Sequence, residues 1–292
     1  MSDVAVGSLG LPRVRGFRSA VVARLRRDRL AFAGFMIIVV ITLASLLAPL
    51  AAPHDPLEMR PADRYAPPSR AHPLGTDFFG RDILSRLMYG GRISLLIGLA
   101  TVSINGALGL PLGLLAGYLG GRVDTVIMRL ADTLIVFPTL IFAMALMAMR
   151  GVGLLELVIA LTFKGWTPLA RLVRSEALAI REREFVQAAR AIGASHGRII
   201  FRHVLPNSLS AFVVYATLGI TTPILAEAAL SFLGLGIQPP AISWGQMISQ
   251  ERNYMQLAWW PVTFPGVVIA LTVLGFNLLG DGLRDALDPR LK

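Results

Sequence analysis

Ionisable residues lie in or beside the long apolar runs of this 292-residue sequence. Asp132, Lys164 and Glu227 are three of them, and Glu156 is a fourth. Charged groups are costly in a bilayer and usually serve a function there, so these residues could bind protons or ions in a secondary transporter. Such transporters are usually built from inverted repeats, and the sequence shows none. We therefore expect Asp132, Lys164 and Glu227 to support helix packing or conformational switching along a pathway, with ion-coupled secondary transport as the alternative.

The sequence lacks the motifs of several enzyme classes. Neither of its lysines lies in the phosphate-binding pattern GxxxxGK followed by Ser or Thr, so this chain is not expected to hydrolyse ATP. The zinc-protease pattern HExxH is absent, and without cysteine there is no thiolate nucleophile. We expect no catalytic residue, cofactor or metal site in this chain. An intramembrane serine protease would need a histidine within its helices, whereas all four fall in expected loops or at span ends: His54, His72, His196 and His203.

The composition is that of a membrane protein. Hydrophobic residues make up 54% of the chain and charged residues 16%, and the mean hydropathy is +0.63. A net charge of +10 would suggest a nucleic-acid partner for a soluble protein. In a polytopic membrane protein the same arginines hold loops on the cytoplasmic side. We therefore expect a lipid bilayer around this chain and no nucleic acid.

Long runs without a charged residue predict an all-α polytopic protein with six transmembrane helices. The first run is longer than the about 7 to 15 apolar residues of a secretory signal, so it is expected to remain as a span. The fourth helix is interrupted by Glu156 and Lys164, and its prediction depends on the opposite charge character of the flanking loops. The six helices are expected at residues 30–52, 93–117, 125–149, 152–173, 208–233 and 261–281.

The distribution of basic residues predicts the orientation. Residues 1–29 form a basic tail, and most other basic residues fall in segments on the same side of the predicted membrane. The long loop at residues 53–92 also holds arginines, but nearly as many acids offset them. We expect a multi-pass protein of the bacterial cell membrane, with a core domain at residues 93–281 and a short tail at residues 282–292. Both termini are then cytoplasmic.

Three glycines at a spacing of four residues, Gly109, Gly113 and Gly117, lie in the second predicted span. Small residues at this spacing let two helix backbones approach closely. We therefore expect this helix to pack tightly against another one. The pattern does not distinguish a transporter from other helix bundles.

A polar segment at residues 175–207 joins the fourth and fifth predicted spans and is long for a simple turn. Its apolar residues recur at helical spacing over residues 175–192, which predicts a helix. Gly193 suits the C-terminus of this helix, and Ser195 suits the N-cap of a second short helix, which Pro206 is expected to limit. The segment is therefore expected to form a cytoplasmic helical hairpin, which either binds another protein or lies on lipid headgroups.

The hairpin contains Gln187-Ala188-Ala189, then Gly193 after three further residues, then Leu205-Pro206. This pattern resembles the Glu-Ala-Ala loop of ABC importer permeases, whose short helix docks on the ATPase subunit. Gln187 stands where the motif name has Glu. The resemblance implies an ATPase-coupling role for ten residues: Gln187, Ala188, Ala189, Arg190, Gly193, Ala194, Ser195, His196, Leu205 and Pro206.

Further motifs extend the resemblance over nearly all of residues 30–292. They look like those of the C-type permease subunits of the dipeptide/oligopeptide/nickel importer branch. In the outer loop these motifs are His72-Pro73-Leu74-Gly75-Thr76-Asp77, Gly80-Arg81-Asp82, Ser85-Arg86 and Arg92-Ile93-Ser94-Leu95. Towards the C-terminus they are Glu227-Ala228, Leu230-Ser231-Phe232-Leu233-Gly234-Leu235-Gly236, Trp244-Gly245, Gly280-Asp281 and Asp288-Pro289-Arg290.

This resemblance implies a type I ABC importer permease fold with a cytoplasmic coupling-helix hairpin. It implies a heterodimer with a homologous permease, in which each chain forms half of the pathway. Two ATPase domains that bind ATP and Mg, and an extracytoplasmic solute-binding protein, are the other implied partners. The outer loop at residues 53–92 and the segment at residues 235–260 are the expected docking surfaces for the binding protein. The expected cargo is a dipeptide or oligopeptide, with glutathione and nickel chelates left open.

Overall fold

The computed structural model describes residues 28–287, and over this range the chain is helical without any strand. An isolated β-bridge joins Thr76 and Asp82 in this range. The all-α prediction is therefore confirmed. Most of the predicted basic tail, residues 1–27, and the motif Asp288-Pro289-Arg290 lie outside the described residues.

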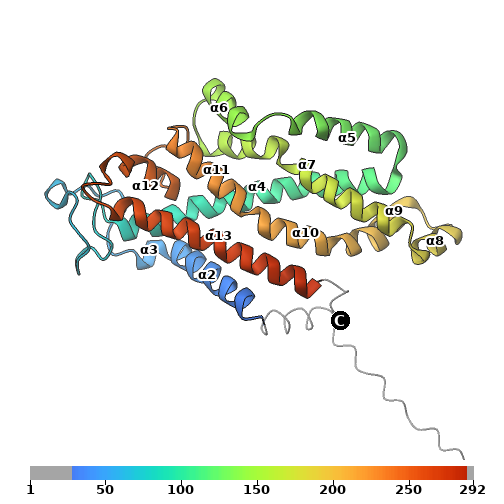
Figure 1. Cartoon of the computed structure of the whole chain (residues 1–292), viewed down its shortest axis with the longest axis horizontal. Coiled ribbons are helices and arrows are strands. Elements are labelled where there is room, and N and C mark those ends of the chain that lie inside the picture. The colour runs from blue at the N-terminus through green and yellow to red at the C-terminus, as the bar shows by residue number, and fades with distance from the viewer. Residues whose placement is uncertain (1–27, 288–292) are drawn as a thin grey trace, which may run out of the picture.

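Four helical runs in the described range are long and apolar enough to cross a membrane. They lie where the first, second, fifth and sixth spans were predicted, whereas the total of six spans remains a prediction. Three of them are the single helices α2 (Arg29–Leu46), α4 (Ile83–Leu119) and α13 (Trp260–Leu287), which run side by side in Figure 1. The other is the run His196–Phe232, composed of α9 (His196–Ile199), the π-helical turn η2 (Ile200–Val204), α10 (Leu205–Gly219) and α11 (Thr221–Phe232).

The predicted fourth span is occupied by the 28-residue helix α7 (Leu154–Arg181). Hydropathy alone does not identify it, because Glu156, Lys164 and three arginines lie along it. It also extends beyond the predicted end at residue 173, into the polar segment at residues 175–207. Shorter helices complete the described chain: α3 (Ala48–Ala51), η1 (Pro61–Asp63), α8 (Glu184–Ala191), α12 (Trp244–Glu251) and η3 (Arg252–Tyr254).

The predicted third span is not one continuous helix. It consists of α5 (Gly121–Ile135) and α6 (Thr139–Arg150), which meet at an angle of 80°. Pro138 lies at the break and has an extended backbone. The helix is interrupted here because the proline ring disfavours helical geometry in the residue before it and because proline has no N–H to donate. The prediction of a single helix over residues 125–149 was therefore wrong.

Helix α4 begins at Ile83, well before the predicted start at residue 93. Asp82 caps it by accepting a hydrogen bond from the backbone N–H of Ser85 at 2.8 Å. Arg86 is buried in this first part of the helix and lies 3.5 Å from the carboxylate of Asp77. The charge interrupts the apolar run in the sequence, but the fold pairs it with an acid from the preceding loop.

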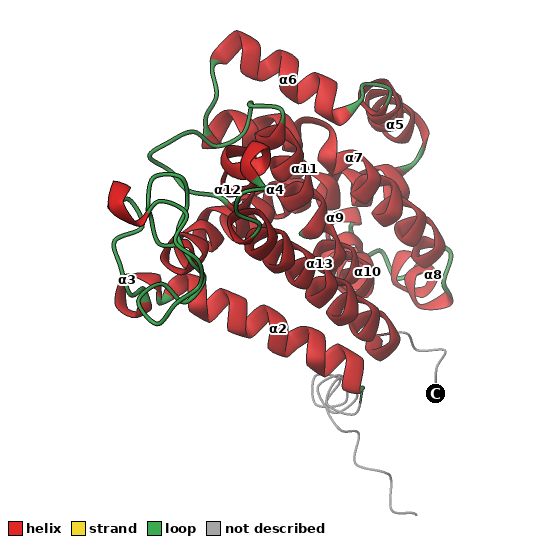
Figure 2. Ribbon diagram, turned by 60° about the vertical axis from the view of Figure 1, so that its left-hand side comes forward, coloured by secondary structure: helices red, strands yellow, loops and turns green. Residues whose placement is uncertain are grey.

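Close packing of α4 against α7 forms the centre of the molecule (Figure 2). A Cβ atom added at Gly109, Gly113 or Gly117 would lie 2.5–2.7 Å from a carbonyl oxygen of α7. The absence of side chains at these three positions is therefore what permits the two backbones to approach. The predicted role of the glycine series in helix packing is confirmed.

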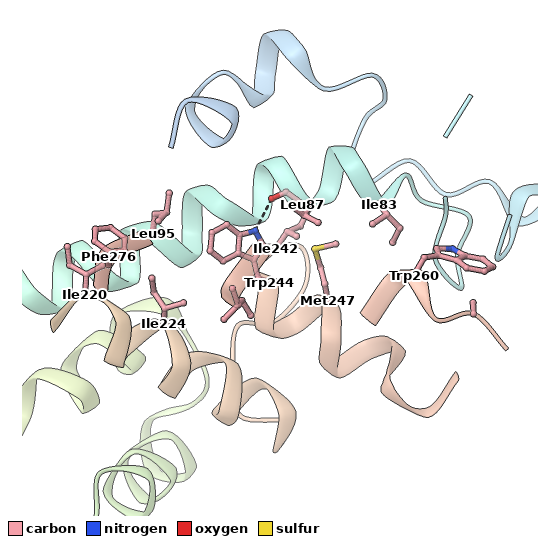
Figure 3. Close-up of a cluster of buried hydrophobic side chains, with 12 residues drawn as sticks. Ile83, Leu87, Leu95, Ile220, Ile224, Ile242, Trp244, Met247, Trp260 and Phe276 are labelled. Carbon is pink, nitrogen blue, oxygen red and sulfur yellow. Dashed lines mark hydrogen bonds between the residues drawn. The ribbon is translucent and has the colours of Figure 1, made fainter. Parts of the chain in front are cut away.

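A cluster of buried apolar side chains fastens α12 to the first half of α4 (Figure 3). Trp244 lies at its centre and donates a hydrogen bond from its indole Nε1 to the carbonyl of Leu87 at 2.9 Å. Ile83, Ile242 and Met247 belong to the same cluster. Burying an indole with its N–H satisfied stabilises both elements, so the segment after α11 is held firmly against the bundle.

Candidate functional site

The predicted hairpin forms at one end of the molecule, at the right of Figure 1. Gly193 adopts a left-handed backbone with φ of 80° and ends α8. The N–H of Gly193 donates to the carbonyl of Arg190, and the N–H of Ala194 donates to that of Ala189, both at 3.0 Å. This pair of bonds defines a Schellman turn. The next residue, Ser195, accepts a hydrogen bond from the N–H of Arg198 and caps α9, so both local predictions are confirmed.

Two boundaries of the hairpin differ from the prediction. The expected helix over residues 175–192 is divided, because α7 runs on to Arg181 and α8 starts anew at Glu184. Pro206 does not limit the second helix, which continues through η2 into α10. Proline lacks the N–H that a helix interior needs, and the π-helical turn directly before Pro206 accommodates this defect.

One face of the hairpin packs on the rest of the chain and another is free of it. Val186 and Ala189 are buried with residues of α4 and α7. Phe185 and Ile192 are 41% and 85% exposed, and Ala188 between them is also exposed. These three residues, at helical spacing, form an apolar stripe that the described part of the chain leaves uncovered. Ala189, which directly follows Ala188, faces inward.

Tyr118, near the end of α4, connects the hairpin to the bundle. Its hydroxyl lies 3.1 Å from Nδ1 of His196, and the guanidinium of Arg190 lies 5.9 Å from the centre of its ring. Gln187 instead donates its side-chain amide to the carbonyl of Arg181 at 3.2 Å. A glutamate could not donate this bond. No sequence pattern indicated Tyr118, since its role depends on contacts between distant segments.

Leu205 and Pro206 lie within the continuous helical run between the hairpin and α10. Leu205 is half-buried and Pro206 is exposed. Asn207 and Ser208 donate side-chain hydrogen bonds back to the carbonyls of His203 and Val204, at 2.6 and 3.0 Å. These bonds give a hydrogen-bond donor to two carbonyls of the π-helical turn η2. The hairpin is therefore joined to α10 by helix, without an intervening loop.

Asp132 and Lys164 both tie α5 to α7. The carboxylate of Asp132 accepts a hydrogen bond from Arg171 at 2.5 Å, with both side chains largely exposed. Lys164 donates to the carbonyl of Phe137, at the break between α5 and α6, also at 2.5 Å. A cation is favoured where a helix ends because the terminal carbonyls there carry partial negative charge. Both contacts lie around the break between α5 and α6.

Glu227 joins α11 to the segment that contains α12. It is 1% exposed and accepts hydrogen bonds from the hydroxyls of Ser231 and Ser243 at 2.6 and 2.7 Å. A Cβ atom at Gly245 would lie 2.8 Å from its carboxylate. Asp132, Lys164 and Glu227 thus have different partners, and their contacts are those of helix packing.

A second polar centre lies in the outer loop, at the opposite end of the molecule from the hairpin (Figure 1). Asp77 accepts a hydrogen bond from Arg81 at 2.6 Å and also faces Arg86. Both arginines donate to the side-chain oxygen of Gln250, at 3.1 and 3.2 Å. The outer loop is therefore bound to α12 by a buried network. Asp77, Arg81 and Arg86 are part of the motifs that carried the family resemblance.

Glu251 extends this network and is buried between the outer loop and α12. Tyr65 donates its hydroxyl to one carboxylate oxygen at 3.0 Å, and the N–H of Phe78 faces the other at 3.4 Å. Burial raises the pKa of Glu251 above its ordinary value of 4.5, and the nearby charge of Asp77 acts in the same direction. Ionisation of Glu251 therefore opposes folding of this part of the chain.

The raised pKa of Glu251 gives a pH prediction with a definite sign. A carboxyl whose pKa is raised by folding contributes stability that is present below its unfolded-state pKa and is lost as pH rises through its folded-state pKa. We expect Glu251→Gln to reduce the fall in thermal stability as the pH rises above the ordinary pKa of 4.5, measured on the purified full-length chain. Glu58→Gln, at an exposed position in the outer loop, is the control. Equal pH dependence in wild type and Glu251→Gln would contradict the assignment.

Comparison with protein families matches two models to this chain. The first, described as the inner membrane component of binding-protein-dependent transport systems, matches residues 109–292. The second, the N-terminal transmembrane domain of oligopeptide transport permease C, matches residues 17–68. Together they include α2, most of the bundle and the whole hairpin.

Curated relatives cover most of the chain. It is 46% identical to the dipeptide transport system permease protein DppC of Alkalihalophilus pseudofirmus, over 92% of this chain and 88% of the relative. It is 45% identical to the di/tripeptide transport system permease protein DppC of Pseudomonas aeruginosa, over 90% and 88%. The oligopeptide transport system permease protein OppC of Bacillus subtilis is 40% identical, over 92% and 88%.

The fold also matches a solved transporter. A chain of the methionine ABC transporter MetNI, in an inward-facing conformation, aligns with a TM-score of 0.57 and 20% identity, covering 70% of this chain and 96% of that chain. This likeness confirms the predicted ABC importer permease fold. The apolar helices and the family matches identify a multi-pass membrane protein, and they give no support to the ion-coupled alternative. The chain belongs to the family of inner-membrane components of binding-protein-dependent transport systems.

Proposed function

We propose that this chain is a permease subunit of an ATP-driven importer of dipeptides or oligopeptides, in which it forms half of the translocation pathway. The observation that carries this proposal is the hairpin with its uncovered apolar stripe, Phe185, Ala188 and Ile192. The relatives are named as dipeptide, di/tripeptide and oligopeptide permeases, and this supports the choice of cargo. Glutathione and nickel chelates are the alternative cargoes.

The hairpin is the proposed docking site for an ATPase subunit, which binds ATP and Mg. A short helix with an apolar stripe suits a groove on a partner protein, since binding removes the exposed apolar surface from water. Gln187, Ala188 and Arg190 lie on α8, where they can contact the partner directly. The angle of α8 is set by the Schellman turn at Gly193 together with Ala189 and Ala194. The direction of the chain after this turn is set by Ser195 and His196, at the start of α9.

Movement of the docked hairpin reaches the membrane by two routes. His196 begins the helical run that includes Leu205 and Pro206 and continues to Phe232, so motion of α9 displaces α10 and α11. Arg190 and His196 also contact Tyr118, which belongs to α4. In this proposal the partner performs the chemistry, and the chain transmits the resulting movement to the pathway.

The remaining partners follow from the same arrangement. A homologous permease completes the heterodimer, and a second ATPase domain binds beneath it. A solute-binding protein docks at the other end, on the outer loop and on the segment that contains α12. This orientation places both termini in the cytoplasm. A reporter fused after Lys292 that proved extracytoplasmic would contradict it.

Energy coupling is the experiment that tests the proposed function. The chain is expressed with the homologous permease, ATPase and binding-protein genes in a host without peptide importers. We expect uptake of labelled dipeptides or oligopeptides to be lost when the ATPase gene is deleted, because this chain has no nucleotide-binding motif of its own. Uptake that continues without the ATPase, driven by a proton or sodium gradient, would overturn the proposal.

A further inference from the structure

Two imidazoles and a carboxylate meet in the outer loop, at the opposite end of the molecule from the hairpin (Figure 1). His54 follows α3, His72 lies beyond η1, and Asp82 directly precedes α4. One possible ligand atom from each residue lies within 4.8 Å of the others. The function proposed above assigns no role to this group. The sequence analysis predicted no metal site in this chain.

The distances within the cluster suit a metal ion. Oδ1 of Asp82 lies 2.9 Å from Nδ1 of His72 and 3.6 Å from Nδ1 of His54. In a tetrahedral zinc site with metal–ligand bonds of about 2.0–2.1 Å, two ligand atoms are about 3.3 Å apart. The two measured separations lie on either side of this value. Small side-chain adjustments would therefore bring both pairs to coordination geometry.

Hydrogen bonding within the cluster leaves ligand atoms available. Nδ1 of His54 is buried and has no hydrogen-bond partner, a costly state for a polar atom. Oδ2 of Asp82 accepts bonds from the backbone N–H and the hydroxyl of Ser85, both at 2.8 Å, so Oδ1 is left to face the imidazoles. Ser85 also accepts a hydrogen bond from the backbone N–H of His54 at 3.1 Å. The three candidate ligands are thus held in position by the start of α4.

The surroundings supply the other features of a metal site. Nε2 of His72 lies 4.0 Å from a carboxylate oxygen of Asp63. Histidine ligands usually direct their second ring nitrogen to such a carboxylate, which fixes the orientation of the ring. His54 also lines a pocket of about 680 Å³ together with Tyr89 and Arg92. An ion from solvent therefore has a route to the cluster, and water has room to act as a further ligand.

We propose that His54, His72 and Asp82 bind a divalent transition-metal ion of the zinc class, with water completing the coordination. Two imidazoles and one carboxylate suit zinc and its neighbours, whereas Mg²⁺ and Ca²⁺ prefer oxygen ligands alone. Binding replaces the hydrogen bond between His72 and Asp82, because Nδ1 of His72 must carry no proton when it binds the ion, and the proton of a neutral ring then lies on Nε2, facing Asp63. Because the ligands come from three separate segments, the ion fastens the outer loop to the start of α4.

Metal binding to the full-length chain, purified in detergent through a tag without histidines, tests this proposal. After treatment with a chelator, the protein is incubated with Zn²⁺, desalted and analysed by mass spectrometry for bound zinc. We expect a single zinc ion per wild-type chain, and an affinity at least about tenfold weaker in His54→Ala and in His72→Ala. His203→Ala, which alters a histidine in the hairpin, is the matched control and should bind zinc as wild type does.

A second measurement separates loss of the site from loss of the fold. Asp82 also caps α4, so Asp82→Asn could disturb folding, whereas His54 is partly exposed and tolerates truncation better. Co²⁺ bound at the cluster should give the intense visible bands of a tetrahedral site in wild type and His203→Ala but not in folded His54→Ala. The proposal is overturned if wild type binds no Zn²⁺, leaving a simple histidine–aspartate hydrogen bond. It is equally overturned if His54→Ala binds Zn²⁺ as tightly as wild type.

Discussion

Gly193→Val should abolish ATP-dependent import while leaving the protein in the membrane. Gly193 adopts φ of 80°, where a β-branched residue is strongly disfavoured. The left-handed conformation costs an ordinary residue about 1–2 kcal/mol, enough to change an equilibrium about 5- to 30-fold. The added strain opens the Schellman turn that sets the angle of α8. Uptake and substrate-stimulated ATP hydrolysis, measured in the same vesicles, should both fall.

Two further variants isolate the backbone effect at Gly193. Gly193→Asn should retain most activity, because asparagine tolerates the left-handed conformation. Gly197→Val adds the same side chain four residues later, in α9, where the backbone is not left-handed and a Cβ meets no atom within 4 Å. It should import normally, because the apolar stripe proposed for docking does not include α9. Normal import and stimulated hydrolysis in Gly193→Val would contradict the role of the turn.

Gly113→Leu should prevent the helix bundle from forming stably. A Cβ atom at Gly113 would lie 2.6 Å from the carbonyl oxygen of Ala170 and 2.8 Å from a side-chain carbon of Val173. Because the nearer atom belongs to the backbone of α7, no change of rotamer relieves the clash. We expect a loss at the upper end of the about 1–3 kcal/mol that overpacking usually costs, and poor accumulation of folded protein. Thermal unfolding of the purified chain measures it.

The matched control for this helix substitution is Gly266→Leu. Gly266 lies in α13, where an added Cβ meets no atom within 4 Å, so the same change should be accommodated. If Gly113→Leu unfolds at the same temperature as wild type, α4 and α7 do not pack as closely as described here.

Features that depend on local chemistry were predictable from the sequence. Gly193 and Ser195 have the residue types that a helix end and a helix start require, and the structure places them so. The glycine series predicted tight packing because the small size of Gly113 and its neighbours is visible in the sequence. The ATPase partner of the hairpin was predicted from the family resemblance, because no residue pattern alone could identify it.

Features that depend on distant contacts were not predictable in the same way. Arg86 interrupted the apolar run, and its pairing with Asp77 and Gln250, which lets α4 start early, is visible only in the fold. The 80° bend at Pro138 is stabilised by Lys164 of another helix. Pro206 indicated a helix end, but the π-helical turn before it absorbs the missing hydrogen bond and the helix continues.

Docking of the hairpin on an ATPase subunit can be tested by site-specific crosslinking. The chain contains no cysteine, so Ala188→Cys and Leu57→Cys each introduce a single reactive thiol, one on α8 and one on the exposed outer loop. A photoactivatable thiol reagent is attached, and the assembled transporter is irradiated. We expect Ala188→Cys to crosslink to the ATPase subunit and Leu57→Cys not to do so. An import-competent complex in which Ala188→Cys fails to label the ATPase would contradict it.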